Sequence, residues 1–275
     1  MLELSKKICK KVVNNGFHNF HVFHSKNKSK FSIVFAHNIL GNHKDMKFLI
    51  EKFIDKFNVI AIDFSGHAGS DNLTKYSYDA YLHDCVAALN YADTSHVIWI
   101  GQGIGGILGA KLAKLNSSPI LGLVAFDVMK FTNKSIDILD IEFEYKTFID
   151  AREAIYEKYS KINKNILDQI MLDKYKVMNE MFVNNYHIKI ISQIDNFFNC
   201  NVLSYLEGVK CKTLVMDDQD LLKSLKNSYI DVYNVDNEII LMYQEEQINF
   251  IYNWANSIFN NAEVFMEQFQ MKHVS

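Results

Sequence analysis

The sequence is short of arginine, proline and paired cysteine, and each shortage limits what the protein can be. Arg152 is the only arginine, so recognition of phosphates or nucleic-acid bases through arginine side chains is disfavoured. Pro119 is the only proline, and turns must be made by asparagine and glycine. The four cysteines show no metal-site spacing and follow no secretory leader, which predicts a reducing, cytoplasmic location. The sequence contains no apolar run long enough to predict a membrane span.

Neither sign of charge dominates the composition. The 29 basic and 32 acidic residues leave a formal charge of −3, which provides no field to hold a nucleic acid or an anionic membrane surface. Apolar residues make up 49% of the 275 residues, enough for a sizeable buried core. We therefore expect a globular protein with neither a nucleic-acid partner nor a membrane partner.

Short apolar runs alternate with segments of helical period along much of the chain. This alternation is typical of parallel strands joined by helices, so the predicted fold class is α/β. A continuous apolar run such as 96–100 is typical of a strand buried on both faces. Strands are expected at residues 17–24, 31–36, 58–62, 96–100, 120–126, 213–216 and, more weakly, 229–233, and helices at 46–57, 77–91, 104–115 and 245–259.

The strand pattern is interrupted between about residues 129 and 206. Charged, helix-forming sequence takes its place, with helices expected at 145–159 and 164–177. We interpret residues 129–206 as a helical insertion into an α/β core formed by residues 1–128 and 207–275.

A glycine-dense turn, Ile100-Gly-Gln-Gly-Ile-Gly-Gly106, joins an expected strand to an expected helix. Read as Gly101-x-Gly103-x-x-Gly106, it satisfies the dinucleotide fingerprint, and Asp127 follows about twenty residues later, where a ribose-binding acid belongs. Read as Gly-x-Gly103-x-Gly, it resembles the nucleophile elbow of the α/β-hydrolase family, with glycine at the position of the serine.

Three further segments resemble the same family in order and spacing. Phe35-Ala-His-Asn-Ile-Leu-Gly41 is similar to its His-Gly loop, residues 60–71 to its Asp-x-x-Gly-x-Gly-x-Ser-Asp loop, and residues 76–84 to the helix opening that follows. The resemblance covers residues 31–127. It implies a mostly parallel central sheet with helices on both faces, and it makes the insertion a helical lid.

The resemblance also implies a ligand site at the strand ends. The backbone N–H groups of Ile39 and Ile104 are expected to form an oxyanion hole, which depends on no particular side chain. His37, Asn38 and Gln102 adjoin these two positions in the sequence. We therefore expect these five residues to bind a small acyl, ester or carboxylate ligand, without a cofactor or a metal.

The catalytic positions depart from the family. Gly103 has no side chain and cannot act as a nucleophile. Asp220 falls at the position of the family's acid. The base should be a histidine around Glu238, but the chain holds no histidine between His187 and His273. The resemblance therefore implies a hydrolase design without its nucleophile and its base.

Three functions stay open. The first is a non-catalytic protein that binds a small ligand or another protein. The second is an esterase-like hydrolase in which Asp220 or His37 activates water and no acyl-enzyme forms. The third is a dinucleotide-binding protein that uses Gly101–Gly106. We favour the first, because loss of both nucleophile and base removes several orders of magnitude of rate.

Three histidines, His18, His21 and His24, form a regular run that invites a metal site. Successive side chains of a strand face opposite sides, so His21 points away from the other two. We therefore expect no metal ion at this run.

Loop residues at the strand ends offer further candidates. His37 and His67 could act as an unusual base, but we favour hydrogen bonds to the backbone. Asp63 and Asp127 could accept hydrogen bonds from a ligand, but we favour the capping of turns.

Overall fold

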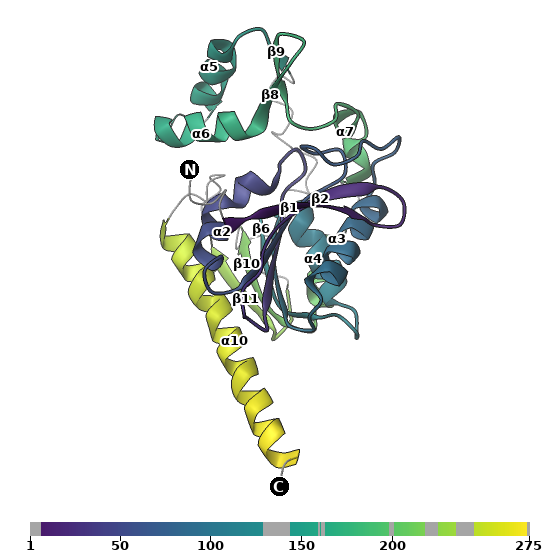
Figure 1. Ribbon diagram of the computed structural model, residues 1–275, viewed down its shortest axis with the longest axis vertical. Coiled ribbons are helices and arrows are strands. Elements are labelled where there is room, and N and C mark those ends of the chain that lie inside the picture. The colour runs from purple at the N-terminus through teal and green to yellow at the C-terminus, as the bar shows by residue number, and fades with distance from the viewer. Residues whose placement is uncertain are drawn as a thin grey trace.

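Eight strands of the described chain form one central sheet (Figure 1). The computed structural model describes residues 7–128, 144–158, 160, 163–197, 201–217, 225–234 and 245–273. The strand order is β1-β2-β4-β3-β5-β6-β10-β11. The pairs β1–β2 and β2–β4 are antiparallel, and the other neighbouring pairs are parallel. The strands are β1 (Cys9–Asn14), β2 (Asn19–Ser25), β3 (Ser32–Ala36), β4 (Asn58–Asp63), β5 (Val97–Gln102), β6 (Ile120–Phe126), β10 (Lys212–Asp217) and β11 (Ile230–Asn234).

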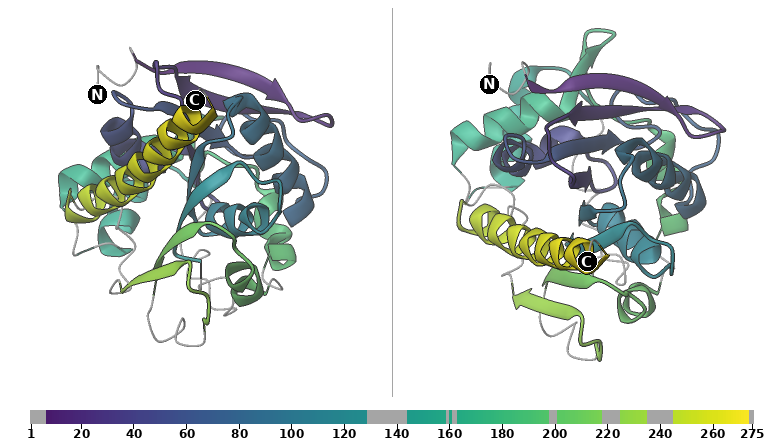
Figure 2. Two further views of the ribbon diagram at one scale, coloured as in Figure 1. Left: turned by 90° about the horizontal axis from the view of Figure 1, so that it is seen from below. Right: turned by 60° about the horizontal axis from the view of Figure 1, so that its bottom comes forward.

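Helices cover both faces of this sheet, as Figure 2 shows. One face packs against α3 (Tyr78–Ala92), α4 (Ile104–Ala113) and α8 (Val202–Glu207). The other packs against α2 (Lys47–Phe53) and α10 (Glu245–His273). None of the helices in the described residues is both long and apolar enough to cross a bilayer.

The sheet separates two apolar clusters because side chains along a strand alternate between its faces. In β3 and β5, Val34 and Trp99 belong to the cluster of α3 and α4, whereas Phe35 and Ile98 belong to the cluster of α2 and α10. Trp99 is completely buried. The predicted α/β fold, with a mostly parallel sheet between two layers of helices, is confirmed.

The described part of the expected helical lid is not purely helical. It contains α5 (Phe148–Lys158) and α6 (Lys164–Lys174), but also a three-stranded antiparallel sheet in the order β7-β9-β8. These elements have a small apolar cluster of their own, centred on Ala151, Ile155 and Leu167. We call the described residues between 144 and 184 the cap. The short strands are β7 (Glu144–Tyr145), β8 (Tyr175–Met178) and β9 (Met181–Asn184).

The described part of residues 185–207 packs on the main core. It contains α7 (Lys189–Ser192), the 3-10 helix η4 (Ile194–Phe197) and α8. Ile190 and Phe197 are completely buried in the cluster of α3 and α4. The predicted limits of the insertion, 129 and 206, stay a prediction.

Polar contacts hold the cap and the segment after it to the core. On one side, the backbone of His187 donates to the carbonyl of Gly66 over 2.6 Å, and its Nδ1 lies 2.8 Å from the hydroxyl of Tyr76. On the other side, the side-chain amide of Asn42 donates to the carbonyl of Asp173 in α6 over 3.0 Å. The cap and the segment after it are therefore tied to the core at two separate places.

Candidate functional site

Gly103 makes the sharp turn between β5 and α4. Its φ of 50° and ψ of −117° lie where side chains are strained and glycine is favoured. Its N–H donates to the carbonyl of Phe126 over 2.8 Å, which ties the turn to the end of β6. The turn therefore places residue 103 at the end of the sheet, between a strand and a helix.

The neighbouring glycines allow α4 to pack closely against the sheet. A Cβ at Gly105 would overlap the backbone of Ala36, and one at Gly101 would overlap the backbone of Gly105. The indole N–H of Trp99 donates to the carbonyl of Gly105 over 2.9 Å, which adds to the close packing. Close packing therefore explains Gly101 and Gly105, and no bound dinucleotide is needed to explain them.

The side chain of Asn38 occupies the space beside Gly103. Its Oδ1 accepts hydrogen bonds from the backbone N–H groups of Ile39, over 2.8 Å, and Ile104, over 3.3 Å. A Cβ built on Gly103 would overlap the Asn38 carboxamide. The two N–H groups expected to form an oxyanion hole therefore do converge, and an oxygen atom of the protein itself lies between them.

His37 and His67 use both ring nitrogens to bind backbone. Nδ1 of His37 donates to the carbonyl of Asn38, and its Nε2 accepts the N–H of Phe64 over 3.0 Å. His67 donates from Nδ1 to the carbonyl of Ser65 and accepts the N–H of Leu40 at Nε2. Burial lowers the pKa of His37 and lowers that of His67 to about 3. Both rings are therefore neutral and fully hydrogen-bonded at neutral pH.

The side chain of Gln102 binds a loop residue. Its Nε2 donates to the carboxylate of Asp127 over 3.0 Å, and Asp127 itself has a φ of 55° at the end of β6. Of the five residues expected to bind a ligand, three meet at one point, and His37 and Gln102 are engaged elsewhere. Asp220 and Glu238, which mark the predicted acid and base positions, lie outside the described residues.

The sequence suggested that Asp63 caps a turn, and in the structure its carboxylate binds His43. Its Oδ1 accepts from the backbone N–H of His43 over 2.7 Å and from Nδ1 of the same residue over 2.9 Å. Burial alone would raise the pKa of this carboxyl, but the two hydrogen bonds and charge of His43 outweigh burial and hold the pKa below its usual value. His43 was not among the predicted site residues, and its place before the 3-10 helix η1 (His43–Met46) gave no sequence signal for this pair.

Comparison with known proteins agrees with this architecture. The family model described as the alpha/beta hydrolase fold matches residues 32–152. The chain has the α/β-hydrolase fold. A crystal structure of an alpha/beta hydrolase from Novosphingobium aromaticivorans superposes with a TM-score of 0.76, at 14% identity, over 91% of this chain and 98% of that one.

Two curated relatives match this α/β-hydrolase-fold protein over part of their length. One, from Haemophilus influenzae, is provisionally named an esterase/lipase and is 24% identical over 96 residues, 35% of this chain and 33% of the relative. The other, from Cupriavidus necator, is named 3-hydroxybutyrate-oligomer hydrolase and is 26% identical over 124 residues, 42% of each chain. The matched part of this chain thus spans less than half the length of each relative.

A serine, a histidine and an aspartate also gather elsewhere in this α/β-hydrolase-fold protein. The hydroxyl of Ser65 donates to the carboxylate of Asp84 over 2.7 Å, and it also contacts Nε2 of His18. The same Nε2 lies 2.9 Å from Asp84, so the imidazole does not bridge the other two groups as it does in a catalytic triad. Ser65 is completely buried. We therefore interpret the cluster as a structural support for the loop after β4.

Proposed function

We propose that this chain is a non-catalytic member of the α/β-hydrolase fold that binds a small ligand. The observation that carries the proposal is the position of the Asn38 oxygen, hydrogen-bonded to the N–H groups of Ile39 and Ile104. In an esterase of this fold, that point receives the oxygen that becomes negatively charged during the reaction. An internal acceptor there competes with every substrate.

The nucleophile position supports the same proposal. Gly103 offers no hydroxyl, and the space that a serine side chain would need is filled by the Asn38 carboxamide. Loss of the nucleophile or the base costs a serine protease a factor of about 10⁶ in kcat. Since both nitrogens of His37 and of His67 bind backbone groups, neither ring is free to take a proton from water.

Hydrolysis of p-nitrophenyl butyrate tests this proposal. We expect the wild-type protein to release p-nitrophenol no faster than buffer does. The His37→Gln variant serves as a control, because it identifies activity that belongs to this chain rather than to a contaminant. Turnover by the wild type that the His37→Gln variant lacks would overturn the proposal.

A hydrolase is the second candidate, and the specific observation in its favour is the naming of the two relatives as an esterase/lipase and a hydrolase. Such an enzyme would attack its substrate with water, since the elbow carries no nucleophile. Ester turnover by the wild type that is lost in an Asp220→Asn variant would assign this activity. The expected ligands are the same acyl, ester or carboxylate compounds in both cases.

The remaining predictions concern the location of the protein, its partners and dinucleotide binding. We propose a cytoplasmic location and no nucleic-acid or membrane partner, on the grounds of composition and charge. The dinucleotide hypothesis predicts thermal stabilisation by NAD or NADP, about 2.7 kcal/mol at a hundred times the dissociation constant. We expect neither compound to shift the melting temperature.

A further inference from the structure

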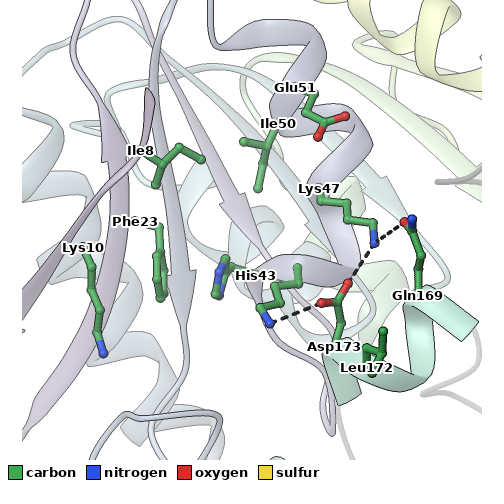
Figure 3. Close-up of a pocket in the computed structure, with 11 residues that line it drawn as sticks. Ile8, Lys10, Phe23, His43, Lys47, Ile50, Glu51, Gln169, Leu172 and Asp173 are labelled. Atoms are coloured by element: carbon green, nitrogen blue, oxygen red, sulfur yellow. Dashed lines mark hydrogen bonds and ion pairs between the residues drawn. The ribbon is translucent and has the colours of Figure 1, made fainter. Parts of the chain in front are cut away.

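A cavity of about 360 Å³ lies between β1, β2, α2 and the cap helix α6, apart from the turn at Gly103 (Figure 3). A volume of this size is within the range of small-molecule sites. It is more than twice the roughly 150 Å³ of a cavity that accepts benzene. The cavity is lined by Ile8, Lys10, Phe23, His43, Lys44, Lys47, Ile50, Glu51, Gln169, Leu172 and Asp173.

One end of the cavity carries a cation and a positioned imidazole. Lys10 in β1 is paired directly with Phe23 in β2, so their side chains share one face of the sheet. The ring of His43 stacks on Phe23 with centroids 3.5 Å apart. Lys10, Phe23 and His43 are thus consecutive neighbours along one wall.

The cation at this end is unpaired among the described residues. Nδ1 of His43 donates to the carboxylate of Asp63. The ammonium of Lys10 has no ion pair with any residue that the structure describes. An anion can therefore bind here without breaking an existing interaction.

The other basic residues of the cavity are already paired, and the exposed acid of the cavity is distant from Lys10. Lys44 and Lys47 both bind the carboxylate of Asp173, at 3.2 and 2.8 Å. Glu51, which is exposed, lies at the opposite side of the cavity from Lys10 (Figure 3). An anion is therefore favoured at the Lys10 end and disfavoured at the Glu51 end.

Apolar side chains lie between the two ends. Ile8 and Ile50 stand between Lys10 and Glu51 in Figure 3, and Phe23 adds an aromatic wall beside them. Leu172 of the cap helix lines the same cavity. An alkyl chain placed along this wall would be removed from water, at roughly 0.8 kcal/mol for each buried CH₂ group.

We propose that this cavity binds a medium-chain alkyl carboxylate, with the carboxylate at Lys10 Nζ and the chain against Ile8, Phe23 and Ile50. The inference deepens the ligand binding of the proposed function by giving it a place away from the occupied oxyanion hole. No bond is made or broken in the ligand, so binding at this site is independent of ester turnover.

Isothermal titration with sodium octanoate tests the site, with octylamine hydrochloride and 1-octanol as ligands of opposite and no charge. We expect saturable binding of one octanoate per chain and no binding of octylamine. The Lys10→Glu variant should weaken octanoate binding about tenfold, because an attraction becomes a repulsion. Lys11→Glu is the matched control, since Lys11 is exposed on the same strand, faces the other side and does not line the cavity.

Three results would overturn the site. They are absence of octanoate binding to the wild type, equal binding of 1-octanol, and an equal loss of affinity in the Lys10→Glu and Lys11→Glu variants. Circular dichroism of both variants checks that the fold is retained. Failure here leaves the absence of catalysis standing, whereas turnover of p-nitrophenyl butyrate would overturn the proposed function and leave octanoate binding unaffected.

Discussion

The carboxamide of Asn38 fills the space that a side chain on Gly103 would need. The two positions belong to different loops, one after β3 and one after β5. In the family that this chain resembles, the first position carries glycine and the second carries serine. In this chain Asn38 stands at the first position and Gly103 at the second. The two departures from the family pattern are therefore sterically linked and are best understood as one change.

Gly103→Ser tests this link. A serine at this backbone conformation is strained by about 1–3 kcal/mol, and its side chain also overlaps Asn38. We expect a lower free energy of unfolding in urea, and we expect Asn38→Gly to relieve part of the loss. The double variant should therefore be more stable than the sum of the single effects predicts, by about 1 kcal/mol or more. Strict additivity would show that the two positions do not interact.

Replacement of Asn38 alone tests the hydrogen bonds of its oxygen. Asn38→Leu keeps a similar volume but leaves the N–H groups of Ile39 and Ile104 without their acceptor, so we expect a loss of about 1–3 kcal/mol in unfolding free energy. Asn38→Asp keeps an oxygen acceptor and should lose much less at neutral pH. Chemical denaturation of both variants measures the difference, and equal losses would contradict the assignment.

The buried imidazole of His67 makes stability depend on pH. Its pKa is about 3 in the folded protein, against about 6.5 in an unfolded chain. Between these values only the unfolded chain binds the proton, so this contribution is complete above about pH 6.5 and is lost as the pH falls. We expect His67 to remove up to about 1.4 kcal/mol per pH unit between about pH 6 and 4.

The control for this pH dependence is His67→Gln, measured by urea unfolding at each pH. Removal of the titrating group should flatten the curve of unfolding free energy against pH relative to the wild type. Parallel curves for the two proteins would show that His67 is protonated as easily in the folded state as in the unfolded one.

Much of the fold could be predicted from the sequence. The strands at the centre of the sheet were expected within about two residues of β3, β4, β5 and β6, because strands buried on both faces are continuous apolar runs. The glycine turn at 101–106 marked the strand-to-helix junction. In the cap, however, β8 was assigned to the end of a helix. Asn179 and Glu180 both have positive φ, which makes a tight hairpin, but the usual glycine at the second position is missing.

The candidate site was predicted only in part. Ile39 and Ile104 were expected to converge because backbone N–H groups depend on the fold alone, and they do. That the oxygen of Asn38 would lie between them depends on the space left by Gly103, and a sequence pattern does not give side-chain directions. The pair of His43 with Asp63 joins residues twenty positions apart through packing of η1 against β4, for which no local pattern exists.

The hydroxyl of Tyr76 anchors the segment that follows the cap. It accepts the N–H of Leu73 over 2.9 Å and lies 2.8 Å from Nδ1 of His187. We expect Tyr76→Phe to lower the unfolding free energy by about 1–2 kcal/mol and to speed hydrogen exchange around residues 185–190. Tyr91→Phe is the matched control, because the Tyr91 hydroxyl has no hydrogen bond within the described residues. Equal exchange in both variants would contradict the anchoring role.

Intact-mass measurement of the wild-type protein after incubation with a fluorophosphonate tests the central claim most directly. A serine hydrolase gains one phosphonyl group at its activated nucleophile. With Gly103 at the elbow and the Asn38 oxygen between the two N–H groups, we predict an unchanged mass for the native protein. A stoichiometric adduct that forms on the native protein and not on the heat-denatured one would contradict this account.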